Sequence, residues 1–250
     1  MSTRPVVLVT GGAKRVGRAI ARAFARSGCD LVLTFNTSSD AADGTAKELS
    51  ALGADVRLEH VNLEELTTVE FLGDRLARDL PRLDVLVHNA SEYEPSPLSE
   101  VTGEDLLRNY RVNAAAPLLL SKTLAPLLAA SVLPGGGAIV AMCDMHAMGR
   151  PRRDFAVYSM SKAALAEMVR SLARDLAPRI RVNGVAPGVV AFPDEGPESD
   201  PKMQQKYISH IPLARVGTPA DAAEVVRWLA LDAHYVTGEI VRVDGGRWLA

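Results

Sequence analysis

Short apolar runs alternate with longer segments of helical periodicity along the whole chain. The short runs are rich in β-branched residues and stop at glycine, proline or polar residues, which is typical of buried strands. They predict strands over residues 5–10, 30–35, 54–61, 83–88, 137–142, 179–185 and 239–243. Apolar positions three and four apart predict helices over residues 16–26, 41–52, 66–80, 106–130, 155–176 and 220–231.

Steady alternation of strand and helix favours right-handed crossovers and a parallel sheet. We therefore predict an α/β fold, with one doubly wound, seven-stranded parallel sheet covered by helices on both faces. No linker or repeat interrupts residues 1–250, so we expect a single domain. Pro117 and Pro126 predict a kink or break in the helix over 106–130. A stretch rich in acids and prolines begins at residue 191 and predicts a substrate lid over about 191–212.

Composition limits the kinds of function that we expect for this protein. The 28 basic and 30 acidic residues nearly cancel, so no strong field should draw the chain to nucleic acid or to a membrane surface. Cys29 and Cys143 have neither disulfide nor metal-site spacing. We see no secretory signal and no run of about 20 apolar residues that would span a membrane. We expect a cytoplasmic enzyme or binding protein that acts on small molecules, without a metal.

A glycine turn lies between the first predicted strand and helix, from Thr10 to Gly17. Gly11 allows a sharp turn, Gly17 allows the helix to approach the sheet, and the helix N-terminus suits a pyrophosphate. This strand–turn–helix context predicts a dinucleotide site.

The second predicted strand ends in Asn36-Thr37-Ser38, without the acid that usually holds an NAD ribose. Lys14 and Arg15 add positive charge in the turn. This combination predicts NADPH as the cofactor. The alternative is that both basic side chains are solvated loop charges.

Tyr158 and Lys162 lie four residues apart and share one helix face. A phenol titrates near pH 10 and is a poor proton donor or acceptor at neutral pH. We expect the neighbouring ammonium to lower the Tyr158 pKa and to hold the nicotinamide ribose.

Two further polar residues fit this chemistry. Asp144 follows the fifth predicted strand, at the sheet edge where α/β proteins bind ligands. Asn113 interrupts an apolar helix and must be hydrogen-bonded if buried. It either routes a water toward Lys162 or is an ordinary polar kink.

These residues resemble the short-chain dehydrogenase/reductase family from Val7 to Gly246. The resemblance includes the glycine turn, Asn89-Ala90, Asn113, Tyr158 with Lys162, residues 183–188, and the closing residues 236–238 and 243–246. It implies a Rossmann-like fold, NAD(P)-dependent hydride transfer and a homotetramer.

Two departures from the common family pattern resemble the pteridine reductases. Arg15 stands where most members have a second turn glycine, and Asp144 where most have a serine. The stretch Asn89-Ala90-Ser91-Glu92-Tyr93 is similar to that subgroup too. By resemblance, Tyr93 would stack on a pterin, and Ser91 and Arg15 would contact cofactor phosphate or pterin.

The resemblance implies three overlapping sets of site residues. The catalytic set is Asp144, Tyr158, Lys162 and Asn113. The cofactor set is Gly11, Lys14, Arg15, Val16, Gly17, Asn36, Thr37, Ser38, Asn62, Leu63, Asn89, Ala90, Ser91, Tyr158, Lys162, Pro187, Gly188 and Val190. The substrate set is Arg15, Ser91, Tyr93, Asp144, Tyr158 and Gly188.

The leading interpretation is an NADPH-dependent reductase of a C=N bond in a pterin or dihydrofolate. A carbonyl or quinone reductase on the same fold is the first alternative, and an NADPH-sensing protein without turnover is the second. We interpret Arg150, Arg152 and Arg153 as a solvated loop cluster, with contact to an anionic substrate tail as the alternative. We expect the apolar C-terminal residues 247–250 to dock, with a neighbouring subunit near its active site as one candidate surface.

Overall fold

The structure, a computed structural model, describes residues 4–192 and 199–250. Seven parallel strands form one sheet in the order β3-β2-β1-β4-β5-β6-β7. The strands are β1 Val6–Val9, β2 Asp30–Phe35, β3 Val56–His60, β4 Val85–His88, β5 Gly137–Met142, β6 Ile180–Pro187 and β7 Ile240–Val243. The predicted single-domain, doubly wound α/β fold is confirmed.

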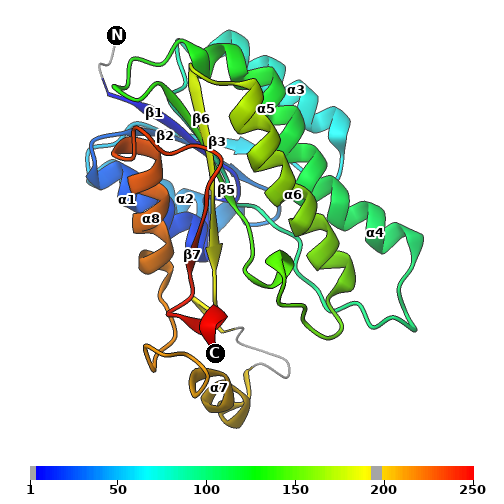
Figure 1. Ribbon diagram of the computed structural model, residues 1–250. Coiled ribbons are helices and arrows are strands. Elements are labelled where there is room, and N and C mark those ends of the chain that lie inside the picture. Colours follow the sequence, from blue (N-terminus) through cyan, green and yellow to red (C-terminus); the bar gives the residue numbers. More distant parts are fainter. Residues whose placement is uncertain (1–3, 193–198) are drawn as a thin grey trace.

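Helices cover both faces of this sheet (Figure 1). One face carries α1 Arg15–Arg26, α2 Ser39–Ala51 and α8 Pro219–Leu231, and the other carries α3 Leu66–Asp79, α5 Ala116–Ala129 and α6 Ala156–Asp175. Successive residues of β1 enter different cores, because Leu8 packs with α3 and α5 while Val7 and Val9 pack with α1. Buried strands with two covered faces therefore read as continuous apolar runs.

The predicted helix over 106–130 differs from the structure in where it is irregular. It consists of α4 Gly103–Tyr110, a π-helical turn η1 Arg111–Ala115, and α5. The irregularity predicted for this region is the π-helical turn, which ends just before Pro117 in the first turn of α5, whereas Pro126 is accommodated inside α5. The helix starts early because Thr102 and Asp105 form a capping box.

Helix α7 Pro201–Ile208 was not predicted. The Asp200 carboxylate accepts a hydrogen bond of 2.9 Å from the Lys202 amide, and Pro201 occupies the first turn. Both are ordinary helix-start signals. The helix lies in the region predicted as a lid, of which residues 193–198 lie outside the described residues.

The span Gly103–Ala129 is long and apolar enough to cross a membrane by length and composition alone. Half of its most apolar window is buried inside the protein, where α5 packs against α3 and α4 against α6. Its composition is thus that of a core helix.

Candidate active site

Most of the predicted site residues line cavities at the carboxyl ends of the strands, where the strand order reverses between β1 and β4. Asn89, which follows β4, connects the ends of these two strands. Its Nδ2 donates to the carbonyls of Thr10 at 3.0 Å and Gly11 at 3.1 Å. The two strand ends are thereby held in one rigid turn.

Two glycines in the turn are sterically required. Gly11 has φ +63°, and a Cβ on Gly17 would lie 2.1 Å from the Gly11 carbonyl oxygen. Arg15 has φ +48°, a left-handed conformation that costs a side-chain-bearing residue free energy. This is the position where the sequence departs from the common family glycine.

A groove of about 490 Å³ runs along this turn. Helix α1 opens onto it with no side-chain cap and no acid in its first turn, which leaves N–H donors and positive dipole for an anion. The groove is lined by Gly11, Lys14, Arg15, Val16, Gly17, Asn89, Ala90, Ser91, Tyr93, Met142, Cys143, Asp144, Tyr158, Lys162, Pro187, Gly188 and Val190.

A second cavity adjoins the groove through shared residues and reaches the end of β2. It brings together Asn36, Asn62 and Leu63, as the resemblance implies, but also Glu64 and Glu92, which the sequence reasoning missed. Thr37 and Ser38 line neither cavity, and Ser38 instead stands at the N-terminus of α2. Their placement in the cofactor set is not supported by the cavity lining.

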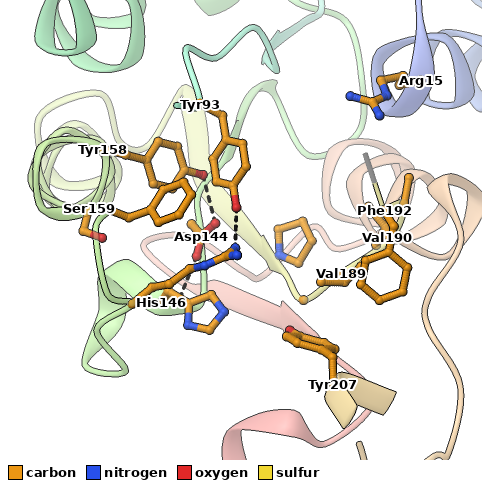
Figure 2. Close-up of a pocket in the computed structure, with 15 residues that line it drawn as sticks. Arg15, Tyr93, Asp144, His146, Tyr158, Ser159, Val189, Val190, Phe192 and Tyr207 are labelled. Atoms are coloured by element: carbon orange, nitrogen blue, oxygen red, sulfur yellow. Dashed lines mark hydrogen bonds between the residues drawn. The ribbon is translucent and has the colours of Figure 1, made fainter. Parts of the chain in front are cut away.

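Tyr158 and Asp144 meet at the end of β5 (Figure 2), and Lys162 lines the same groove. The Tyr158 hydroxyl donates to Asp144 Oδ2 at 2.9 Å, and the His146 backbone N–H donates to Asp144 Oδ1 at 2.6 Å. Lys162 Nζ lies 5.8 Å from the Tyr158 ring centroid and donates to the Met142 carbonyl at 2.7 Å. The phenol and the carboxylate are directly coupled, whereas the ammonium is held to the strand.

The surroundings of Tyr158 raise its pKa well above the usual value, first through burial and then through the charge and hydrogen bond of Asp144. The expected lowering by Lys162 is therefore wrong for this arrangement. Burial also lowers the Lys162 pKa. The phenol stays protonated at neutral pH, which suits a proton donor.

Asn113 lies in the π-helical turn η1 and is fully buried. Its Oδ1 accepts from the Glu92 backbone N–H at 2.9 Å, and its Nδ2 donates to the Glu92 carbonyl at 3.0 Å and to Ser161 Oγ at 2.9 Å. Both amide hydrogens are thus used by protein acceptors. These contacts support an anchor for the segment around Glu92 rather than a route for water to Lys162.

Tyr93 forms part of the wall of a third cavity, which lies beside the groove. Its ring stacks on Phe155 with centroids 4.9 Å apart and meets Tyr158 edge-on at 4.8 Å. Tyr93 is 43 % exposed and lines both spaces, so it retains accessible ring surface.

This third cavity has a volume of about 200 Å³, and we name it the substrate cavity after the role that we propose for it. Its lining includes residues that sequence reasoning did not assign to the site: His146, Arg152, Phe155, Ser159, Phe192 and Tyr207. The prediction that Arg152 is a solvated loop charge is wrong, because its guanidinium covers Phe155 at 4.4 Å. The predicted Ser91 lies in the groove but not in the substrate cavity.

The C-terminal residues dock on their own chain. The Trp248 backbone N–H donates to Asp244 Oδ2 at 2.8 Å, its ring lies beneath Arg242, and Arg247 covers the Tyr207 ring. Arg150 donates to the Arg247 carbonyl. The tail thereby connects the loop after β5 with α7, within one subunit.

Comparisons with known proteins agree with this geometry. The family described as enoyl-(acyl carrier protein) reductase matches residues 11–247. The chain is 31 % identical to 7alpha-hydroxysteroid dehydrogenase of Escherichia coli over 241 residues, covering 96 % of this chain and 92 % of the relative. It is 33 % identical to pteridine reductase 1 of Leishmania tarentolae, covering 98 % and 96 %.

Among solved structures, a blue fluorescent protein from a metagenomic library, in complex with NADPH, superposes with a TM-score of 0.87 at 32 % identity. That superposition covers 97 % of each chain. The names of the two relatives refer to different substrates, a hydroxysteroid and a pteridine. The chain belongs to the short-chain dehydrogenase/reductase family of NAD(P)-dependent oxidoreductases.

Proposed function

We propose that the protein is an NADPH-dependent reductase of a C=N bond in a pterin or dihydrofolate-type substrate. The observation that carries this proposal is the 2.9 Å hydrogen bond from Tyr158 to Asp144 beside the Tyr93 ring. A carbonyl needs only a hydroxyl to polarise it. A pterin has basic ring nitrogens and an amino group, so a carboxyl group that accepts or relays protons suits it better.

Some residues of the site would orient the substrate, and others would transfer a proton to it. Tyr93 presents a ring on which a flat heterocycle can stack. Tyr158 donates its proton to the nitrogen of the reduced bond, and Asp144 orients Tyr158 and the substrate. The bound cofactor supplies the hydride to the adjacent carbon. Lys162 binds the Met142 carbonyl at the end of β5, and Asn113 holds the backbone of Glu92.

The groove fits a dinucleotide phosphate. The uncapped start of α1 and the basic Lys14 and Arg15 favour its phosphates. Asn36 at the end of β2 presents no negative charge there, which favours NADPH over NADH. Pro187, Gly188 and Val190 would flank the nicotinamide end.

The relatives support more than one substrate class. Pteridine reductase 1 of Leishmania tarentolae supports the pterin, and 7alpha-hydroxysteroid dehydrogenase of Escherichia coli supports a carbonyl or alcohol. The hydrogen-bonded Tyr158–Asp144 pair favours the pterin substrate. A sensor without turnover would not need the pair.

NADPH oxidation by the purified protein tests the proposal. We expect turnover with 7,8-dihydrobiopterin or 7,8-dihydrofolate and little with diketones or quinones. Asp144→Ser should shift the preference toward carbonyl substrates. Turnover only with diketones or quinones would identify a carbonyl reductase, and cofactor binding without any turnover would identify a sensor. Unchanged pterin turnover in Asp144→Ser would contradict the proposed role of the carboxylate.

We further propose a cytoplasmic homotetramer, as the resemblance implies. Half-exposed apolar side chains at Leu107, Tyr110 and Leu118 on α4 and α5 support association. The lid over 191–212 also remains a proposal, supported by Phe192 and Tyr207 in the substrate cavity.

A further inference from the structure

Helix α7, which brings Tyr207 to the substrate cavity, has little packing of its own. It has eight residues, and every one of them stays at least partly exposed. Both apolar cores of the sheet are built from described residues outside α7. A helix this short is marginal in water without tertiary contacts. The position of Tyr207 therefore depends on the contacts that its own side chain makes.

The Tyr207 ring contacts Phe192 and Arg247. Phe192 meets it edge-on with centroids 6.0 Å apart, and the central carbon of the Arg247 guanidinium lies over it, 5.3 Å from its centroid. Figure 1 shows α7 beside the C-terminal end of the chain. A guanidinium on an aromatic face is attracted by the ring quadrupole. Arg247 thus joins α7 to the C-terminal tail, residues 247–250.

The backbone of this tail is held by parts of the protein other than α7. The Arg247 N–H donates to the Asp244 carbonyl at 3.1 Å, and Arg150 donates to the Arg247 carbonyl. The Trp248 N–H donates to Asp244 Oδ2 at 2.8 Å. A Cβ on Gly149 would lie 3.3 Å from the Trp248 ring, so this ring packs on the loop after β5. Arg247 therefore reaches α7 from a support that does not depend on α7.

Tyr207 shares the substrate cavity with the groups proposed to transfer the proton. It projects into this cavity from α7 (Figure 2) and lines it together with Tyr93, Asp144 and Tyr158. Burial raises the Tyr207 pKa, and the positive charge of Arg247 is the strongest effect that opposes this rise. A displacement of α7 would remove one wall of the cavity, so a substrate bound there would be held less firmly.

We propose that Arg247 is a positioning residue, which holds Tyr207 and α7 at the substrate cavity, so that the C-terminal tail sets the affinity of its own subunit for substrate. This inference rests on the proposed function in one respect, because it takes this cavity to be the place where the substrate binds.

Amide hydrogen exchange of the NADPH-bound protein, followed by mass spectrometry, tests the positioning without a substrate. In Arg247→Ala, residues 201–208 should exchange about 3- to 10-fold faster, because a cation–π contact is lost. Residues 219–231 of α8 should keep the wild-type rate, which shows that the variant is folded. Arg247→Lys keeps a cation over the ring and should restore part of the protection, whereas Arg247→Met should not.

The same tail supplies a matched control. Leu249 is 85 % exposed, and Leu249→Ala should leave the exchange of both helices unchanged. Wild-type exchange of residues 201–208 in Arg247→Ala, or equal acceleration in α7 and α8, would overturn the positioning role whatever the substrate is.

Steady-state kinetics with 7,8-dihydrobiopterin measures the consequence for substrate. Arg247→Ala should raise the KM for dihydrobiopterin about 3- to 10-fold, change kcat less than about twofold and leave the KM for NADPH unchanged, as for a loss of substrate binding alone. Leu249→Ala should change none of these constants. Faster exchange of α7 with an unchanged KM for dihydrobiopterin would overturn the control of affinity by the tail.

Failure of the proposed function gives a different result. If the wild type turns over the diketone diacetyl but no pterin, pterin reduction is overturned, and the same rise in KM is expected for diacetyl in Arg247→Ala. If the wild type turns over neither compound, the exchange of residues 201–208 still decides whether Arg247 positions α7.

Discussion

At the scale of single residues, the main feature is the partner of Tyr158. A phenol beside an ammonium alone would tend toward phenolate, but here the Tyr158 hydroxyl donates a hydrogen bond of 2.9 Å to the Asp144 carboxylate. Because burial and this negative charge raise the Tyr158 pKa, the phenol remains a proton donor far into the alkaline range. Such a donor suits reduction of a basic nitrogen.

The pH dependence of reduction follows from this arrangement. Asp144→Asn removes the negative charge that raises the Tyr158 pKa, so the pKa should fall. The alkaline limb of the profile of kcat/KM against pH should move to lower pH, along with a drop in kcat of about 10-fold or more. Steady-state rates between pH 6 and 10 measure the shift as an alkaline limb that enters this range only in Asp144→Asn. A profile of Asp144→Asn that shows no alkaline limb in this range, like the wild type, would show that Asp144 does not control the proton donor.

Arg15 has a strained backbone conformation and also places a positive charge in the groove. Arg15→Gly removes the left-handed strain at φ +48° but adds flexibility to the unfolded chain, and the two effects are each about 1 kcal/mol. We therefore expect the free energy of unfolding to change by less than about 1 kcal/mol.

The same substitution removes a cation from the groove. The KM for NADPH should rise about 10-fold and the KM for NADH much less, as for loss of one charged hydrogen bond. Urea unfolding and cofactor kinetics measure the two effects. Equal changes for both cofactors would place Arg15 at the pyrophosphate or the substrate instead of the 2′-phosphate.

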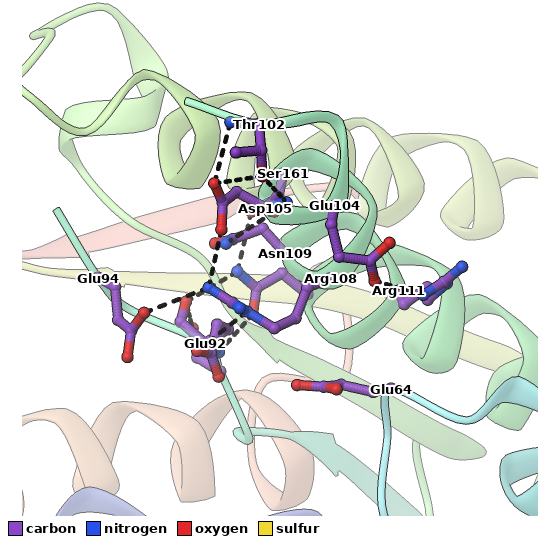
Figure 3. Close-up of polar contacts among 12 residues, drawn as sticks. Glu64, Glu92, Glu94, Thr102, Glu104, Asp105, Arg108, Asn109, Arg111 and Ser161 are labelled. Carbon is purple, nitrogen blue, oxygen red and sulfur yellow. Dashed lines mark hydrogen bonds and ion pairs between the residues drawn. The ribbon is translucent and has the colours of Figure 1, made fainter. Parts of the chain in front are cut away.

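At the scale of elements, α4 and η1 hold the segment that carries Tyr93. Arg108 reaches both acids that flank this tyrosine, with Nη2 3.3 Å from Glu94 Oε2 and Nε 3.7 Å from Glu92 Oε1 (Figure 3). Asn113 binds both backbone polar groups of Glu92. Charged and neutral contacts from consecutive helices thus fix one short segment from two sides.

This anchoring can be tested with two arginines three residues apart. Arg108→Ala should raise the KM for dihydropterin about 3- to 10-fold through a looser Tyr93, with a smaller change in the KM for NADPH. Arg111 pairs with Glu104 alone among the described residues, at 3.1 Å. Arg111→Ala is therefore the control and should alter neither constant. Equal effects of the two substitutions would argue against positioning by Arg108.

At the scale of the whole molecule, Arg181 joins the sheet to α8. It is 6 % exposed, and it donates to the carbonyls of Leu229, Ala230 and Ala233 at the end of α8 and to Gly135 before β5. One buried guanidinium thereby satisfies the C-terminus of a core helix.

Removal of this group should destabilise the whole domain. Arg181→Met removes the charged donor that these four carbonyls share and should lower the free energy of unfolding by about 3 kcal/mol. The exposed Arg179, close by on the same segment, is the control, and Arg179→Met should change stability by less than about 0.5 kcal/mol. Equilibrium urea unfolding compares the two. A loss below 1 kcal/mol in Arg181→Met would mean that water replaces the lost bonds.

The sequence by itself determined the sheet, its parallel direction and the positions of the turn and of Tyr158 with Lys162. These features depend on local periodicity and on steric rules that hold within a few residues, and the boundaries of the predicted elements outside residues 103–130 agree within two residues. The helix-start signals at Asp200 and Thr102 were also local, but each begins a helix of eight residues, which is too short for a clear periodic pattern.

Only the tertiary structure decided which partners the site residues have. Lys162 binds the Met142 carbonyl instead of controlling the phenol, Asn113 holds Glu92, and Arg152 turns inward beside an exposed Arg153. Long side chains from distant segments compete for the same partners, and burial then sets their protonation. That competition depends on distances in the folded chain, which spacing along the sequence does not contain.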